Sequence, residues 1–170
     1  MALIAVVSVF IVRTFLVQPF LVSGDSMSPN FSNGDYLLVD ELTYHFRDPA
    51  RGEVVVFRYP GGDSSTYFIK RVIGLPGEDV RIAGGKVYIV NKESPNGFQI
   101  DESYLPIKTI TSGDATYKLG PGQYFVLGDN RSYSFDSRSW GLLGGKEIVG
   151  IARLRLWPLD SFRAFAAPQY

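Results

Sequence analysis

Residues 67–90, YFIKRVIGLPGEDVRIAGGKVYIV, consist of three short apolar runs separated by two turns. The runs are rich in β-branched and aromatic side chains, which favour strands. Pro76 and Gly77 mark the first turn, and the pair Gly84–Gly85 is typical of a two-residue hairpin loop. Runs of the same kind occupy residues 35–40, 53–60, 123–129 and 147–158.

Short strands at regular spacing, without a long amphipathic helix, are typical of an all-β domain. We therefore expect a mainly β fold, an antiparallel β-sandwich or partly open barrel. The strand signal weakens at about residues 91–122. This segment is expected to form a smaller inserted lobe.

The composition excludes several kinds of function. The 170 residues contain 17 Lys and Arg against 17 Asp and Glu, so no net positive field attracts nucleic acid. There is no cysteine and only one histidine, His45, which excludes disulfides, cysteine-ligated metals and a histidine-rich metal site. The chemistry is therefore expected to use hydroxyl, amine and carboxylate groups.

The N-terminal residues are unlike the rest of the chain. Residues 1–12, MALIAVVSVFIV, are apolar, and a second apolar piece follows Arg13. As a helix, twelve residues span about 18 Å, less than the ~30 Å hydrocarbon core of a bilayer. We expect a short, uncleaved membrane-anchor helix within residues 1–22, which lead into a domain over residues 23–170. A cleaved signal peptide is the alternative, but the basic segment and cleavage-site pattern of such peptides are missing.

Residues 24–29, GDSMSP, place Ser26 in a cluster of turn-forming residues. The cluster is either an ordinary turn or a nucleophile held on a tight bend, and a serine nucleophile needs a base nearby. His45 fits a solvated or packing residue better than a base. Lys70 shares one strand face with Phe68 and Val72, where desolvation would lower its pKa and yield a neutral amine. A strand-edge lysine that reaches solvent is the alternative.

Residues 127–141, LGDNRSYSFDSRSWG, are unusually dense in hydrogen-bonding groups for a connecting loop. Phe135 and Trp140 indicate that part of this loop is buried. Buried charges must be paired, which predicts an ion pair of Asp136 with Arg138 or of Asp129 with Arg131. A loop stiffened in this way is a common support for a site.

In order and spacing, these three stretches resemble the motifs of bacterial type I signal peptidase, the membrane-bound Ser/Lys protease that removes signal peptides from exported proteins. The resemblance covers about residues 13–158, and KRVIGLPG and GDNR followed by DSR are its most specific strings. It implies Ser26 as the nucleophile and Lys70 as the general base. It also implies that Ser134 orients the lysine amine, that Asp129, Asp136 and Arg138 hold the site together, and that Met27 lines the substrate pocket.

The same resemblance implies acyl transfer without a metal or cofactor. The implied partners are a lipid membrane and secreted preproteins whose signal peptides carry small residues at the first and third positions before the cut. Nucleic acid is not an expected partner. The implied location is the cell membrane, with a single-pass anchor and the catalytic domain, residues 23–170, on the extracytoplasmic side.

Three positions depart from the commoner motifs. Gly24 stands where Gram-negative members tend to carry a serine whose hydroxyl stabilises the oxyanion, which leaves that work to the Ser26 N–H. Ser132 and Tyr133 replace a commoner Asp-Asn pair.

Self-cleaving LexA-like repressors share the Ser/Lys dyad, and a catalytically inactive relative is a further alternative. The apolar N-terminus and the 127–141 loop favour the signal peptidase.

Overall fold

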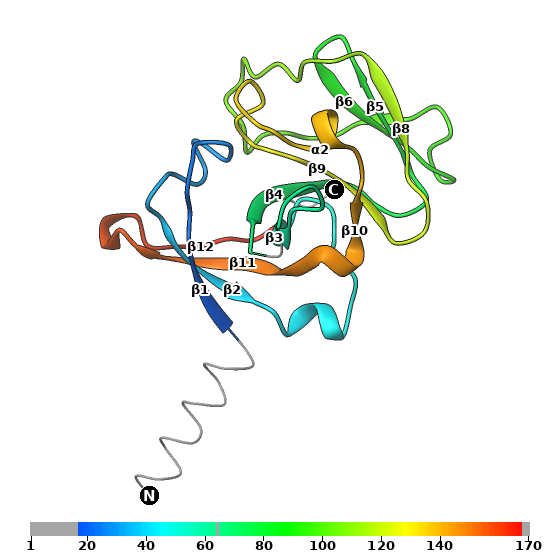
Figure 1. Cartoon of the computed structure of the whole chain (residues 1–170). Helices are drawn as coiled ribbons and strands as arrows, with labels where there is room; N and C mark the ends of the chain where they lie inside the picture. Colours follow the sequence, from blue (N-terminus) through cyan, green and yellow to red (C-terminus); the bar gives the residue numbers. More distant parts are fainter. Residues whose placement is uncertain (1–16, 64, 168–170) are drawn as a thin grey trace, which may run out of the picture.

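The computed structural model describes residues 17–63 and 65–167, which fold into two antiparallel sheets (Figure 1). The mainly β, antiparallel fold predicted from the sequence is confirmed. The expected anchor helix falls largely on residues 1–16, outside the described residues. Residues 17–21, which the sequence placed with the anchor, form a strand of the larger sheet. Within the described ranges, no helix has the length and apolar character needed to cross a bilayer.

The larger sheet contains eight strands in the order β1-β2-β11-β3-β4-β9-β10, with β12 paired to β11. Every neighbouring pair in it is antiparallel. Its strands are β1 (Val17–Leu21), β2 (Tyr36–Asp40), β3 (Val54–Arg58), β4 (Tyr67–Gly74), β9 (Gln123–Leu127), β10 (Leu143–Gly144), β11 (Ile148–Trp157) and β12 (Arg163–Ala164).

The smaller sheet forms a separate lobe, seen beside β4 and β9 in Figure 1. Its strands follow the order β7-β6-β5-β8. They are β5 (Asp79–Ala83), β6 (Lys86–Val90), β7 (Phe98–Gln99) and β8 (Ala115–Lys118). The lobe therefore begins at Asp79, earlier than the predicted boundary near residue 91. The reason is that the hairpin at Gly84–Gly85 pairs with β7 and β8 instead of joining the larger sheet.

Helical structure is limited to single turns in the described part of the chain. They are η1 (Thr43–His45), α2 (Ser137–Trp140), η2 (Gly145–Glu147) and η3 (Leu159–Ser161). Asp136 precedes α2, and its carboxylate accepts a hydrogen bond from the Arg138 backbone N–H. This is the usual way in which an aspartate caps the start of a helix.

Strands β3 and β4 are buried on both faces because each pleat face packs into a different apolar cluster. Val54 and Val56 pack with Met27, while Val55 packs with Val72 on the opposite face. A third cluster, which includes Ile73, Val80 and Phe125, joins the larger sheet to the smaller one. The period of two along a strand accounts for this division. The middle of the sheet is thus a rigid platform for any residue that it carries.

Gly74 ends β4 at the junction of the two sheets, where there is no room for a side chain. A Cβ atom built there would lie 2.4 Å from Val80 Cγ2 and 3.0 Å from Leu119 Cδ2. Such a contact forces the surrounding packing apart, and overpacked cores lose about 1–3 kcal/mol.

We therefore predict that Gly74→Ala lowers the free energy of unfolding by about 1–3 kcal/mol. Gly144→Ala is the matched control, because a Cβ atom there meets nothing within 4 Å and the backbone φ is −72°. Chemical denaturation of both variants measures the difference. Equal stability of the two variants would show that the junction is loosely packed.

Candidate active site

Ser26 lies in the turn between β1 and β2, and buried neighbours hold this turn in place. The Ser28 N–H donates to the Asp25 carbonyl and the Phe31 N–H donates to the Met27 carbonyl. Met27 and Phe31 are fully buried in the same apolar cluster. The turn is therefore fixed from beneath by packing, while Ser26 itself remains partly exposed.

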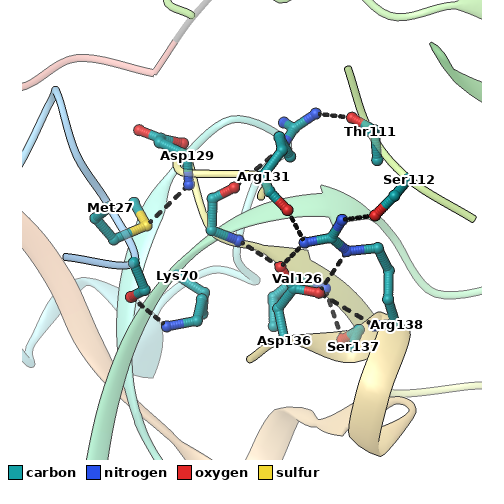
Figure 2. A network of polar contacts seen from close by, with 12 residues as sticks. Met27, Lys70, Thr111, Ser112, Val126, Asp129, Arg131, Asp136, Ser137 and Arg138 are labelled. Carbon is teal, nitrogen blue, oxygen red and sulfur yellow. Dashed lines mark hydrogen bonds and ion pairs between the residues drawn. The ribbon is translucent and has the colours of Figure 1, made fainter. Parts of the chain in front are cut away.

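Lys70 projects from the middle of β4 toward this turn (Figure 2). Its Nζ lies 2.7 Å from Ser26 Oγ and donates to the Ile69 carbonyl at 2.9 Å. The residue is only 3% exposed, and Nζ is 5.2 Å from the centroid of the Phe68 ring. The two residues predicted to form the dyad are thus within hydrogen-bond distance, and the lysine is not a solvent-facing edge residue.

Burial changes the protonation of this lysine. Desolvation disfavours the ammonium form and lowers the pKa of Lys70 from 10.5 to about 8. The negative charges of Asp136 and Asp129 act in the opposite direction and raise the pKa. Near neutral pH a useful fraction of Lys70 is therefore the neutral amine, which can accept a proton from the Ser26 hydroxyl.

Asp129 is buried, and its partner is Arg71, the residue after Lys70. The guanidinium donates to both carboxylate oxygens, at 2.8 Å from Nε and 2.6 Å from Nη2. The predicted alternative pairing with Arg131 does not form. Arg131 instead pairs with Glu102 and donates to the Gly128 carbonyl. The fork–fork geometry of the first pair fixes the loop against β4.

Asp136 is also buried, and the predicted pair with Arg138 is present. Its carboxylate accepts from the Gly128 N–H at 3.0 Å and from Arg138 Nε and Nη2, both at 2.8 Å. Phe135, by contrast, is 52% exposed, and Trp140 is only half-buried. The buried part of the 127–141 loop is thus formed mainly by its charged residues, and its aromatic residues lie nearer the surface.

Ser134 lies against Gly128, close to the nucleophile turn. A Cβ atom at Gly128 would lie 2.1 Å from Ser134 Oγ and 2.4 Å from the Ser26 carbonyl oxygen, so only glycine fits there. Ser134 Oγ is buried and has no hydrogen-bond partner among the described residues. The contact between this hydroxyl and the Lys70 amine, implied by the resemblance, is therefore not formed here.

Met27 occupies a different place from the one expected. It is 1% exposed, and its Sδ accepts from the Asp129 N–H at 3.4 Å (Figure 2). The cleft beside Ser26 has a volume of about 360 Å³ and does not include Met27 in its lining. Its walls are formed by apolar side chains of β1 and the residue that follows it, of β2, β3 and β4, and by exposed residues of the 127–141 loop: Phe20, Val22, Leu37, Val56, Phe68, Ile69, Tyr133 and Phe135.

The structure also places His45 and Gly24, two further residues singled out from the sequence. His45 is exposed in η1, where its Nδ1 is 3.1 Å from the Glu41 carbonyl, consistent with a solvated histidine. Gly24 lines the cleft with a φ of +93°, a backbone conformation that strains any L side chain. This glycine is therefore required by the backbone of the turn. In the described part of the chain, no group of three or more His, Asp or Glu could hold a metal ion.

Sequence reasoning missed three residues of the site: Arg71, Asn30 and Asn130. Asn30 donates to Asp129 at 2.9 Å, and Asn130 donates to the nucleophile turn. Arg71 was hidden because its partner is 58 residues away in the chain. The usable signal was that Arg71 and Asn130 fall inside the two most specific strings of the resemblance, KRVIGLPG and GDNR.

Comparisons with known proteins agree with this geometry. A family model described as signal peptidase, peptidase S26 matches residues 1–157. A probable signal peptidase I-2 of Synechocystis sp. is 37% identical over 91% of this chain and 70% of its own length. Signal peptidase I P of Bacillus subtilis subsp. natto is 37% identical over 95% of this chain and 88% of its own length.

A solved structure adds to the sequence relatives. The crystal structure of a signal peptidase I from Enterococcus faecalis shares 30% identity with a TM-score of 0.50, covering 62% of this chain and 97% of that one. The family match extends over most of the chain, and the two motif strings that carry Ser26 and Lys70 lie within it. The chain therefore belongs to the signal peptidase family, peptidase S26.

Proposed function

We propose that this protein is a serine endopeptidase that removes N-terminal signal peptides from exported preproteins. The observation that carries the proposal is the 2.7 Å approach of the buried Lys70 amine to Ser26 Oγ. A serine hydroxyl is a weak nucleophile unless a base takes its proton. In the described part of the site, Lys70 is the basic side chain placed to do so.

The proposed reaction is acyl transfer in two steps. Neutral Lys70 takes the Ser26 proton while Oγ attacks the carbonyl carbon of the last residue of the signal peptide. The resulting oxyanion is stabilised by the Ser26 N–H. As the C–N bond breaks, the lysine ammonium returns the proton to the leaving amine, the new N-terminus of the mature protein. Water, deprotonated by Lys70, then hydrolyses the acyl-enzyme and releases the signal peptide.

The sheet offers a place for an extended substrate. In β4, pairing with β9 begins at Arg71, so residues 67–70 have only β3 as a strand neighbour. Their other side borders the cleft, across from the end of β1 and the turn that follows it. A preprotein segment could add to β4 as a strand and bring its carbonyl to Ser26. The apolar walls of the cleft favour uncharged side chains before the cut. The preference for small residues at the first and third positions is proposed from the resemblance to the family.

Exposed apolar residues support attachment to a membrane. Leu21, Tyr36 and Trp157 are partners across three adjacent strands, and each is about half exposed. Leu159 and Phe162 continue this surface beyond β11 and are 70% and 60% exposed. Together with the apolar residues 1–12, this surface supports attachment to a membrane. The single-pass anchor at the cell membrane, with the catalytic domain on the extracytoplasmic side, is proposed from the resemblance to the signal peptidase family.

The dyad assignment predicts the effect of three substitutions. Lys70→Met keeps the length and the apolar stem of the side chain, so the fold should survive, but turnover should be almost completely lost. Ser26→Ala should have the same effect, and the double variant should be scarcely worse than either single one, because the residues act as a unit. Mass spectrometry of a model preprotein incubated with detergent-solubilised protein measures the cleavage.

His45→Ala is the matched control, since this histidine is exposed in η1. Its activity should stay close to that of the unsubstituted protein. Substantial cleavage by folded Lys70→Met, or loss of cleavage in His45→Ala, would exclude Lys70 as the base.

The pKa of Lys70 predicts the pH dependence of cleavage. Because only the neutral amine accepts the proton, kcat/KM should rise as the pH increases through about 8. Asp136→Asn removes the ion pair with Arg138 and should lower stability, so it is compared at a temperature at which the variant is folded. Because Asp136 raises the pKa of Lys70, the folded variant should have a lower Lys70 pKa and a rising limb moved to lower pH. Initial rates of peptide cleavage across pH test this direction. A rising limb that moves to higher pH would contradict the electrostatic role of Asp136.

The anchor predicts how the protein partitions. Deleting residues 1–12 should weaken association with membranes or detergent without abolishing cleavage of a soluble peptide, because the site is built from residues beyond 17. Flotation with lipid vesicles measures the first effect, and the peptide assay measures the second. Equal recovery of the intact and shortened chains in the soluble fraction would contradict the anchor.

A further inference from the structure

We propose that Asn130 is a positioning residue that aims the Ser26 N–H at the oxyanion. This inference rests on the proposed function and adds to it a residue to which neither the sequence motifs nor the dyad geometry assigns a role. Asn130 lies in the 127–141 loop, 105 residues from Asp25 in the chain, yet it contacts the nucleophile turn directly.

Two hydrogen bonds from Asn130 hold the backbone of that turn. The side-chain Nδ2 donates to the Asp25 carbonyl at 3.0 Å, and the backbone N–H donates to the Ser26 carbonyl at 3.0 Å. These are the two carbonyls on either side of the Ser26 Cα. Asn130 therefore restrains both peptide planes that meet at the nucleophile.

The first of these bonds fixes the direction of the proposed oxyanion donor. The Asp25–Ser26 peptide bond is trans, so the Ser26 N–H points opposite to the Asp25 carbonyl within one plane. Because the carbonyl is drawn toward Asn130 and the Ser28 N–H, the Ser26 N–H is turned away from both. Among the described residues, no group accepts from this N–H, and Ser26 lines the cleft. The donor is thus available for an oxyanion.

The loop that carries Asn130 is itself firmly held. Asp129 is tied to Arg71, and its N–H donates to Met27 Sδ, one residue beyond the nucleophile. Gly128 approaches the Ser26 carbonyl so closely that a Cβ atom there would be 2.4 Å away. Three consecutive loop residues, 128–130, therefore contact the nucleophile turn. Of these, Asn130 binds the Asp25 carbonyl, which belongs to the same peptide group as the Ser26 N–H.

The contacts of Asn130 differ from those of Lys70, the proposed base. Asn130 donates to the Asp25 and Ser26 carbonyls, and its own carbonyl accepts from the Tyr133 N–H. None of these hydrogen bonds involves Lys70 or Ser26 Oγ. A change of the Asn130 side chain should therefore weaken oxyanion stabilisation without shifting the pH at which Lys70 loses its proton.

The test compares Asn130→Ala with the unsubstituted protein. Alanine removes the Nδ2 donor but keeps the backbone N–H that binds the Ser26 carbonyl. Removal of an oxyanion donor costs about 10²–10³ in kcat, and we expect misalignment of one to cost about tenfold or more. KM should change by less than about twofold, and the rising limb of the pH profile should stay in place.

A peptide boronate gives a second, independent readout. It forms a tetrahedral adduct with a serine nucleophile, and one boronate oxygen takes the position of the oxyanion. Its affinity for Asn130→Ala should fall by about the same factor as kcat/KM, as expected when an interaction is made only in the transition state. Asn96→Ala is the matched control, because this amide is exposed in the smaller lobe. Both readouts should be unchanged in the control.

Three results would overturn the inference. They are an unchanged kcat, an unchanged boronate affinity, and a loss of activity that comes with a shifted pH profile. If Asn130→Ala fails to fold, Asn130→Asp keeps the side-chain shape while replacing the donor with an acceptor, and the same kcat and boronate criteria apply. A wild-type protein that neither cleaves a preprotein nor binds the boronate would instead refute the proposed function.

Discussion

The burial of the Lys70 amine beside Ser26 is the constraint on which the rest of the site depends. A charged ammonium is expensive to remove from water, and the group responds by losing its proton more readily. The residue can be buried because β4 is a central strand, packed on both faces by apolar clusters. The sheet therefore both positions the amine and, by excluding water, lowers its pKa.

Buried ion pairs hold the 127–141 loop over that amine without returning its pKa to the ordinary value of a lysine. Asp129 and Asp136 each raise the pKa of Lys70, but each is paired with an arginine, Arg71 or Arg138. The desolvation of Lys70 remains the larger effect, and its pKa stays near 8. Removing one partner of such a pair would leave an uncompensated buried charge, which is strongly destabilising. The main role of the pairs is therefore to fix the positions of the loop, β4 and the nucleophile turn relative to one another.

The sequence predicted those features that depend on local pattern. Alternation placed Lys70 on one strand face with Phe68 and Val72, and turn residues marked the bend at Ser26. The choice between a buried base and a solvent-facing lysine came from the resemblance to the family. Features that depend on long-range pairing were missed or misplaced. Asp129 pairs with Arg71 and not with Arg131, which is nearer in the sequence. The hairpin at Gly84–Gly85 belongs to the smaller sheet. Strand spacing alone does not determine which sheet a hairpin joins, because that choice depends on contacts between distant residues.

If neutral Lys70 is the base at the pH of catalysis, its loss of a proton can be measured directly. In protein carrying ¹³C-labelled lysine, the Lys70 side-chain signal can be assigned by its loss in Lys70→Met and followed through a pH titration. We predict a midpoint near 8, well below the ~10.4 of an unperturbed lysine side chain. A Lys70 midpoint close to that unperturbed value would exclude a neutral Lys70 as the base.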